Sequence, residues 1–476
     1  MIRYRTLDIE GIWGRLESLE FDASLYIQRF RINDILKRLD LPLIEVILGP
    51  RQSGKTTLLF MIMSELLSRN IVPEQIFYVN MDTIIPTEQF KNPMLLVRQL
   101  ADQGLAGERA YLFIDEVQRL EYPGRFLKGV YDLGKDIKIV VSGSSSLEIK
   151  AKIKESLAGR KRETYLLPLS FREYVLHGKR LPPALNHVEL DRSSVGQWVE
   201  NEALYGRYLR NRMEEVAVFG GYPGVLKQEK REDRLEELSE IHTSYVKRDI
   251  IEFLNMEKPA RINQLIKVLA GQVGNLMNKS EIASLTGTNT VTLSKYLNIL
   301  QETYVTAYLP PLVSNRRNEI KRAHKCFFLD NGFRNLSISQ FNSLGDRTDK
   351  GPLLENMVFS ELLKHRTLDQ SIRFWRTKAG SEVDFVISRE QEDIPVEIKA
   401  GPARPGRLSK SFHAFLDHFS PKKGLFLNRD LFHVTDIKQT RVYYIPIHWF
   451  LFSGLEMILG VEGRTSHFHI LLAKST

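Results

Sequence analysis

Gly49-Pro50-Arg51-Gln52-Ser53-Gly54-Lys55-Thr56 is the stretch that decides the fold of the first part of this 476-residue chain. It follows an apolar run at residues 43–48 and precedes a helical pattern at residues 57–70. In the pattern G-x-x-x-x-G-K-[ST], the glycines let backbone N–H groups turn inward around a triphosphate, and a helix N-terminus adds its dipole. Lys55 can reach the β- and γ-phosphates, and Thr56 offers a hydroxyl to Mg²⁺. The stretch therefore predicts a nucleotide-binding loop.

The composition bounds the class of protein. With 43% hydrophobic and 26% charged residues the chain is globular, and its length predicts several domains. The net charge of +9 favours an anionic partner, nucleic acid first and a membrane surface second. The single cysteine, Cys326, excludes an intramolecular disulfide and a Cys-rich zinc site. The N-terminus lacks a secretory pattern and no run reaches eighteen apolar residues, so we expect a cytoplasmic protein with no membrane partner.

Two acidic residues stand where we expect a strand of the first domain to end. Apolar runs at 75–81 and 111–114 alternate with helical patterns, which predicts parallel βαβ units with ligands at the carboxyl ends of the strands. Asp115 and Glu116 are costly to bury unless they emerge at that edge. We expect Asp115 to hold Mg²⁺ and Glu116 to polarise the water that attacks the γ-phosphate. The alternative is a strand that ends in an acidic turn.

Polar residues at two further places can act on the phosphates. The strand expected from residue 137 runs into Ser142 and Ser144, and an adjacent Asp-Glu pair is typical of ATPases in which one strand lies between the loop and the acids. We expect Ser142 or Ser144 to sense the γ-phosphate or the attacking water, unless this turn only caps the next helix. Arg160 precedes a strand expected at 165–169. Its guanidinium can neutralise charge on the γ-phosphate in cis or across a subunit boundary, or it belongs to a solvated basic face.

Five short motifs together resemble a known family. They are Gly-Pro-Arg-Gln-Ser-Gly-Lys-Thr-Thr at 49–57, Phe-Ile-Asp-Glu-Val-Gln at 113–118, Ser-Gly-Ser-Ser-Ser at 142–146, Ser-Leu-Ala-Gly-Arg at 156–160 and Leu-Pro-Leu-Ser-Phe-Arg-Glu-Tyr at 167–174. The set is similar to a family of bacterial and archaeal ATPases related to the AAA+ class. An uncharacterised C-terminal domain, itself similar to PD-(D/E)XK nucleases, usually follows in that family. The resemblance covers nearly the whole chain and implies ATP hydrolysis.

The middle of the chain predicts a helical connector followed by a winged helix. In the second part, Gly287 permits the turn of a helix-turn-helix, and a strand expected at 304–309 forms the wing. The apolar stripe of the second helix is expected to consist of Val291, Leu293, Leu297 and Leu300. Its polar surface suits contact with bases, whereas the scarcity of Arg and Lys on it suits a protein scaffold.

Three carboxylates and a lysine mark the last part of the chain. Glu355 lies on a helix expected at 352–365, and two strands carry Asp384, Glu397 and Lys399. Strict alternation would turn Val383, Phe385 and Ile387 to one face of the sheet and Asp384 to the other. The four charged residues fill the positions of the PD-(D/E)XK pattern, although Val383 precedes the aspartate where that pattern has a proline. Together they can hold one or two Mg²⁺ or Mn²⁺ ions at a scissile phosphate. An exposed face with a salt-bridged Glu/Lys pair is the alternative.

These patterns predict a multidomain α/β protein. We expect a P-loop ATPase domain with a parallel sheet at 1–180, a helical lid or connector at 181–260, a winged helix-turn-helix at 261–318 and a restriction-endonuclease-like α/β domain at 319–476. The nucleotide is expected to contact Gly49, Ser53, Gly54, Lys55, Thr56, Thr57 and Asp115, and catalysis to use Lys55, Glu116, Ser142 and Arg160. Expected ligands are ATP, Mg²⁺ and DNA, with a protein partner or a second copy of the chain left open. The alternative is a nucleotide-dependent switch whose C-terminal domain binds without cleaving.

Overall fold

The chain folds into two compact units, residues 1–168 and 169–476. The structure is a computed structural model and describes residues 2–7, 13–83, 88–102, 109–144, 157–178, 181, 190, 192–245, 259–313, 322–390 and 392–454. Ser145 and Ser146 of the serine motif, and Ser156 of the motif that ends at Arg160, lie outside these residues. No helix within the described ranges combines the length and the apolar character that crossing a lipid bilayer requires.

The first unit is built on a seven-stranded sheet in its described part, with the order β2-β1-β4-β5-β6-β3-β7. The strands are β1 (Ile2–Leu7), β2 (Trp13–Leu19), β3 (Ile44–Leu48), β4 (Ile76–Asn80), β5 (Ala110–Asp115), β6 (Ile137–Gly143) and β7 (Lys161–Tyr165). All neighbouring pairs are parallel except the hairpin β1–β2. β6 lies between β3 and β5, so the expected separation of the loop strand from the acidic strand by one strand is confirmed.

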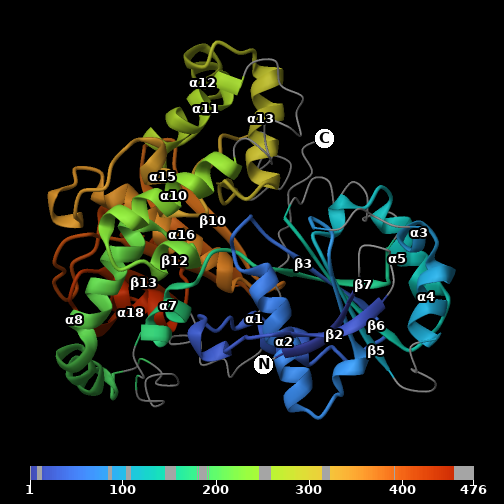
Figure 1. Cartoon of the computed structure of the whole chain (residues 1–476). Coiled ribbons are helices and arrows are strands. Elements are labelled where there is room, and N and C mark those ends of the chain that lie inside the picture. Colours follow the sequence, from blue (N-terminus) through green and yellow to red (C-terminus); the bar gives the residue numbers. More distant parts are fainter. Residues whose placement is uncertain are drawn as a thin grey trace. The chain divides into compact units, whose positions relative to one another are not determined.

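Helices cover both faces of this sheet (Figure 1). α1 (Arg31–Leu36) and α2 (Lys55–Ser68) pack on one face, and α3 (Glu88–Lys91), α4 (Pro93–Asp102) and α5 (Pro123–Asp132) lie on the other. β3 and β5 are buried along their whole length, as continuous apolar runs in a covered parallel sheet should be. Two local predictions were wrong. The apolar spacing of residues 23–40 predicts one helix, but the structure has only a 3₁₀ turn at Ala23–Leu25 and α1 there. The strand expected at 165–169 is β7, which begins four residues earlier.

The second unit begins with a helical region and a helix-turn-helix. Its first helices are α7 (Phe171–Gly178), α8 (Val195–Phe219), α9 (Pro223–Lys227) and α10 (Arg231–Tyr245). They are followed by α11 (Pro259–Gly271), α12 (Lys279–Leu285) and α13 (Thr290–Glu302), and then by the antiparallel pair β8 (Thr306–Leu309) and β9 (Lys325–Phe328). Gly287 has φ +60° at the turn between α12 and α13.

The first turn of α13 differs from the expected apolar stripe. Leu293, Leu297 and Leu300 are buried, but Val291 is 80% exposed. The reason is the helical phase, because Val291 lies two residues before Leu293 and therefore about 200° around the helix from it. The side chain of Asn289 accepts from the backbone N–H of Thr292 at 2.7 Å and caps this first turn. From that start, Val291 lies in the first turn on the outer side of the helix. An apolar side chain is therefore presented at the tip of the helix-turn-helix.

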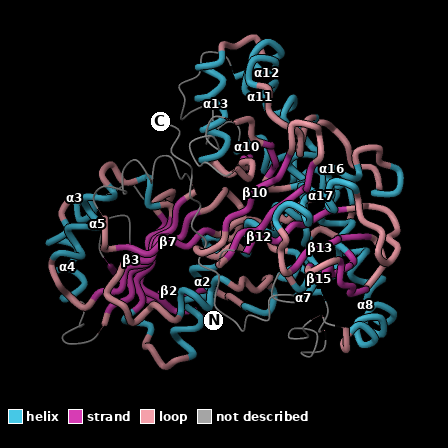
Figure 2. Tube along the Cα trace, turned by 180° about the vertical axis from the view of Figure 1, so that it is seen from behind, coloured by secondary structure: helices cyan, strands magenta, loops and turns pink. Residues whose placement is uncertain are grey.

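The rest of the second unit is a six-stranded sheet in its described part, ordered β10-β11-β12-β13-β15-β14 (Figure 2). The strands are β10 (Ser371–Arg376), β11 (Glu382–Arg389), β12 (Glu392–Ile398), β13 (Lys423–Asn428), β14 (His433–Ile437) and β15 (Thr440–Pro446). β12, β13 and β15 are parallel, whereas β10, β11 and β14 each pair antiparallel with their neighbours. The remaining helices are α15 (Asn331–Ser337), α16 (Lys350–His365), α17 (Lys410–Phe419) and α18 (Ile447–Ser453).

A bulge in β11 overturns the strict alternation expected around Asp384. The register against β10 shifts between Arg373 and Trp375, so β11 has one residue more than its partner there. As a result Val383 and Val386 both belong to the cluster packed around α17. Phe385 instead contacts Phe359 of α16 with ring centroids 5.8 Å apart. Val383 and Phe385 therefore face opposite sides of the sheet, and Asp384 lies at the point where the strand changes face.

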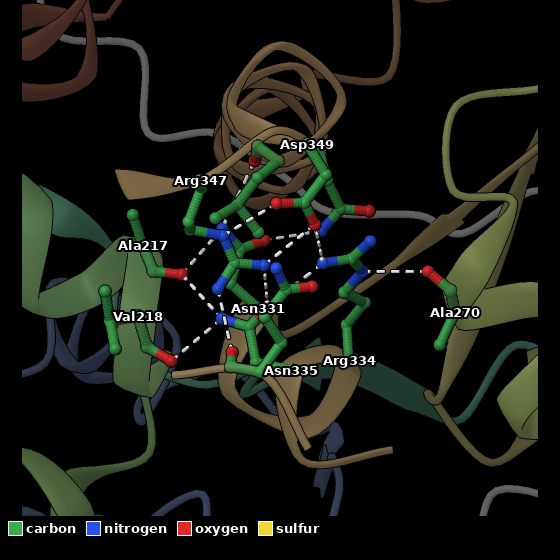
Figure 3. A network of polar contacts seen from close by, with 11 residues as sticks. Ala217, Val218, Ala270, Asn331, Arg334, Asn335, Arg347 and Asp349 are labelled. Carbon is green, nitrogen blue, oxygen red and sulfur yellow. Dashed lines mark hydrogen bonds and ion pairs between the residues drawn. The ribbon is translucent and has the colours of Figure 1, made fainter. Parts of the chain in front are cut away.

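A buried polar network, which we call the α15 network, joins three parts of the second unit (Figure 3). Arg334 and Arg347 both donate to Asp349, the N-cap of α16, at 2.5 and 2.8 Å. Arg334 Nε also donates to the carbonyl oxygen of Ala270 in α11 at 2.9 Å. Asn335 accepts from Arg347 at 3.1 Å and donates to two carbonyl oxygens near the end of α8, each at 2.9 Å. The network ties α11 to the end of α8 and to the start of α16.

Candidate functional site

The backbone of the loop after β3 depends on its two glycines. Gly54 is the N-cap of α2 and has φ +93°, a conformation in which a side chain would be strained. A Cβ on Gly49 would lie 2.1 Å from the carbonyl oxygen of Leu166, so only glycine lets the loop approach the end of β7. The Ser53 side chain is fully buried, and its Oγ has no hydrogen-bond partner among the residues that the structure describes. A buried hydroxyl of this kind fits a loop that binds a polar ligand.

Lys55 and an arginine outside the motif complete the loop. Lys55 is 4% exposed, and its Nζ donates to the carbonyl oxygens of Gly49 and Pro50 at 3.1 and 2.9 Å. The buried guanidinium of Arg29 donates to the carbonyl oxygen of Ser53 and to that of Leu167, both at 2.6 Å. Arg29 thus links the loop to the segment after β7. No sequence motif includes Arg29, which lies 24 residues before Ser53, so its role emerges only from the folded chain.

Asp115 lies directly beside the loop. Its Oδ2 accepts from Thr56 Oγ1 at 2.6 Å and from the Tyr78 hydroxyl at 3.3 Å, and its Oδ1 accepts from Ser142 Oγ. Burial raises the pKa of this carboxyl above its ordinary value, while the hydrogen bonds from Ser142 and Thr56 oppose the rise. A hydroxyl and a carboxylate in contact, both hard oxygen ligands, are a donor set that suits Mg²⁺. The residues present therefore fit the ion that we expected Thr56 and Asp115 to hold.

The carboxylate of Glu116 has different hydrogen-bond partners from that of Asp115. Its backbone has φ +54°, in the left-handed region, and its N–H donates to Asp115 Oδ1 at 3.2 Å and to Ser142 Oγ at 3.3 Å. Its Oε2 accepts from Ser144 Oγ at 3.0 Å and from Gln118 Nε2. Gln118 was not among the expected site residues. The turn after β5 thus separates the two acids and sends only Asp115 toward Thr56.

The other expected residues of the first unit lie at both edges of the sheet. Ser142 ends β6 at the loop edge and donates to Asp115. Thr57 is half-buried in the first turn of α2. Arg160 lies at the opposite edge, because its carbonyl oxygen accepts from the N–H of Ile44 at the start of β3, roughly 15 Å of strand from the loop. Its Nε pairs with Asp132 at 2.9 Å. An action of Arg160 on the phosphates of its own chain does not fit this position.

The carboxylates of the second unit form a charged cluster around the end of β12. Burial raises the pKa of Glu355, on α16, and that of Asp384, on β11, and the two groups interact. Asp384 Oδ2 accepts from the backbone N–H of Ile398 at 2.8 Å. Glu397 accepts from Ser409 Oγ at 2.7 Å and pairs with Lys399 at 2.9 Å.

A lysine that the sequence did not single out belongs to the same cluster. Lys325 of β9 is 3% exposed at its side chain and pairs with Glu382 at 2.5 Å, and its charge also acts on Glu355 and Asp384. Within the described ranges, no three His, Cys, Asp or Glu side chains are grouped so that they could hold a metal ion.

Comparisons with known protein families divide the chain into three matched segments. Residues 42–175 match a family described as an AAA domain. Residues 210–343 match a domain of unknown function (DUF8612), and residues 350–450 match another (DUF4143). With the sheet order and the loop geometry, the first match shows a P-loop ATPase fold in this part of the chain.

Two uncharacterised proteins and several solved structures are similar over longer stretches. A Haemophilus influenzae protein is 25% identical over 433 residues, which are 88% of this chain and 97% of that protein. A Methanocaldococcus jannaschii protein is 26% identical over 74% of this chain and 73% of its own length. The Aeropyrum pernix ORC2 protein, solved in ADPNP and ADP complexes, aligns over 60% of this chain and 85% of its own with a TM-score of 0.32 and 14% identity. The ORC1 protein of that organism, solved in complex with DNA, covers 66% and 93% with a TM-score of 0.27 and 14% identity. These two scores lie below those of chains that share a whole fold.

Proposed function

We propose that the chain binds ATP with Mg²⁺ at the loop of residues 49–56 and hydrolyses it. The contact of Thr56 Oγ1 with Asp115 Oδ2 carries the proposal, because it joins the end of the loop to the end of β5, where a metal ion and the γ-phosphate would meet. Mg²⁺ supplies neutralisation of the phosphate charge when it is bound. Lys55 would bind the phosphates, and Glu116 would orient the attacking water.

Steady-state ATP turnover of purified protein tests this assignment. Lys55→Ala and Glu116→Gln should each lower turnover at least about tenfold, because each removes a group that acts on the γ-phosphate or on the nucleophile. The exposed residues Lys128 and Glu121, in and before α5, provide matched controls. Lys128→Ala and Glu121→Gln should turn over ATP as the unchanged protein does. Equal rates in all five proteins would show that the loop and the acids are not the hydrolytic site.

We further propose that DNA is the partner of the helix-turn-helix. Val291 supports this, since it is 80% exposed at the tip of α13, where an apolar side chain can cover the methyl group of a thymine in the major groove. Lys295 is exposed on the same helix and suits a phosphate contact. Lys295→Glu should weaken DNA binding about tenfold at low salt, whereas Lys410→Glu, a change at an exposed lysine of α17, should not. ATP turnover measured with and without single- and double-stranded DNA then shows whether DNA acts on the ATPase.

A second candidate is that the C-terminal α/β domain binds its partner without cleaving it. The cluster favours this alternative over a nuclease, since the Glu397 carboxylate is already engaged by Ser409 and Lys399. The direct test is incubation of plasmid DNA with the protein and Mg²⁺ or Mn²⁺. We expect no nicking above background. Nicking that disappears in Asp384→Ala and in Lys399→Ala would instead establish a nuclease.

A further inference from the structure

Gln118 lies in a small polar triangle at the edge of the sheet that carries the loop. Its Nε2 donates to Ser144 Oγ at 2.9 Å and to Glu116 Oε2, and Ser144 Oγ donates to the same carboxylate oxygen at 3.0 Å. Gln118 and Ser144 are 5% and 2% exposed. Ser144 directly follows β6, and Gln118 lies in the 3₁₀ turn after β5. The triangle therefore links the ends of the two strands that carry the acids and Ser142.

The chemistry of its neighbours fixes which way the amide of Gln118 is turned. A carboxylate can only accept hydrogen bonds, so the atom of Gln118 that faces Glu116 must be the nitrogen. The carbonyl oxygen, Oε1, then points elsewhere. It is buried and has no hydrogen-bond partner within the described residues. An unsatisfied buried acceptor is destabilising, and it marks a place where water or a ligand is to be expected.

The backbone around the triangle is strained in a way that serves Glu116. The left-handed region is unfavourable for a non-glycine residue, and such a residue persists only where its surroundings hold it. Glu116, at φ +54°, is held from the backbone side by Asp115 and Ser142 and from the side-chain side by Gln118 and Ser144. The position of its carboxylate is thus set by four neighbours and not by the backbone alone.

We infer that Gln118 is a further catalytic residue of the ATPase, and this inference rests on the proposed hydrolysis. Its N–H holds the Glu116 carboxylate in place, and its Oε1 accepts one hydrogen of the attacking water while Glu116 accepts the other. The water oxygen bonds to the γ-phosphorus as the bond from that phosphorus to the β,γ-bridging oxygen breaks, and ADP leaves with the electron pair. One water proton passes to Glu116 and then to solvent. The other stays on the oxygen that becomes part of inorganic phosphate.

Gln118→Met tests the inference, because methionine keeps the length of the side chain but removes both the donor and the acceptor. We expect kcat to fall about 100-fold with KM within about threefold, as for the loss of a group that acts on the nucleophile. Affinity for ADP with aluminium fluoride, a mimic of the transition state, should fall with kcat, while affinity for AMP-PNP should not change. Gln75→Met is the matched control. Gln75 Nε2 also donates, to the carbonyl oxygen of Arg109 at 3.1 Å, but at the opposite edge of the sheet.

Three outcomes overturn the inference. Turnover by Gln118→Met within threefold of the unchanged protein would show that the amide does not act on the water. A parallel loss of AMP-PNP and aluminium fluoride affinity would show that Gln118 only holds the fold. If Gln118→Met does not fold, the third outcome is measured on Gln118→Asn, which keeps the amide but retracts it by one methylene: a kcat within threefold of the unchanged protein, instead of the expected loss of about tenfold, would overturn the inference. Absence of ATP turnover in the unchanged protein would refute the proposed function itself, which is a distinguishable result.

Discussion

Without nucleotide, the Asp115→Asn variant should be more stable than the unchanged protein. With Mg²⁺ and nucleotide, the unchanged protein should be the more stable of the two. Without ligand, Asp115 is a buried carboxylate whose pKa is raised by burial, so its charge is a cost that the fold bears at neutral pH. Asparagine has the same shape, and the hydroxyls of Thr56, Ser142 and Tyr78 can turn to accept from its amide or donate to it. We therefore expect the variant to be more stable by about 1 kcal/mol when no ligand is present.

The size of the effect can be stated in degrees. For a unit of this length, 1–168, a change of about 1 kcal/mol shifts the unfolding temperature by roughly 2–4 °C. Mg²⁺ and AMP-PNP at about 100 times the dissociation constant should stabilise the unchanged protein by about 2.7 kcal/mol, or roughly 5–10 °C. The variant lacks the carboxylate that we expect to hold Mg²⁺ and should gain little. The unchanged protein is then the more stable of the two.

Differential scanning calorimetry with and without Mg²⁺ and AMP-PNP measures both orders, and the transition that responds to nucleotide identifies the first unit. Asp132→Asn is the control, since Asp132 is 43% exposed and pairs with Arg160 at the other edge of the sheet. It should shift the transition by the same small amount in both conditions. If Asp115→Asn gained as much from the ligand as the unchanged protein does, Asp115 would not be a ligand of the nucleotide's metal.

Three further predictions concern other parts of the chain. Asp349→Ala leaves two buried guanidiniums unpaired and should destabilise the second unit by about 3 kcal/mol in urea unfolding followed by tryptophan fluorescence. Asp369→Ala, at an exposed pair, should cost less than about 1 kcal/mol, and equal losses would contradict the structural role of the network. Burial raises the pKa of Glu355, so the folded protein holds a proton that the unfolded chain has released, and the free energy of unfolding should fall as pH rises above about 4.3. Glu355→Gln should remove most of that decline between about pH 5 and pH 8, and an unchanged decline would assign it to other groups. If Arg160 acts across a subunit boundary, mixing Arg160→Ala with Glu116→Gln protein should restore part of the ATP turnover. Turnover of the mixture no higher than that of the separate variants would mean that Arg160 only forms the surface ion pair with Asp132.

The sequence predicted the first unit well because its signals are local. A phosphate loop requires glycine at fixed offsets, and buried parallel strands are continuous apolar runs, so β3, β4, β5 and β6 were found within a residue or two. The order of β3, β6 and β5 was also confirmed, because an adjacent Asp-Glu pair is tied to that arrangement. The strand before which Arg160 stands was misplaced, since the polar residues of β7 do not show the pattern of a buried strand.

What the sequence could not predict depends on contacts between distant residues. The bulge that turns Val383 and Phe385 to opposite faces is set by the register against β10, which a single strand does not encode. Arg29, which also contacts the loop, donates to the carbonyl oxygen of Leu167, 138 residues further along the chain. Lys325 pairs with Glu382, which lies fifty-seven residues after it. Hydrophobic periodicity contains no information on such pairs, so the supporting residues of both candidate sites emerged only from the folded chain.

The α15 network also limits how this polypeptide can be cut or recombined. One family matches a segment that ends at residue 343 and another matches a segment that begins at residue 350, which suggests interchangeable modules. Yet Arg334 from the first segment is neutralised by Asp349 at the threshold of the second, and Asn356 Nδ2 donates to Asn331 Oδ1 across the same divide at 2.6 Å. If the chain were cut between residues 343 and 350, the guanidinium of Arg334 would lose its carboxylate partner. The side-chain amides of Asn331 and Asn356 would lose their hydrogen bond to each other. The two segments should therefore be inherited, expressed and engineered as one piece.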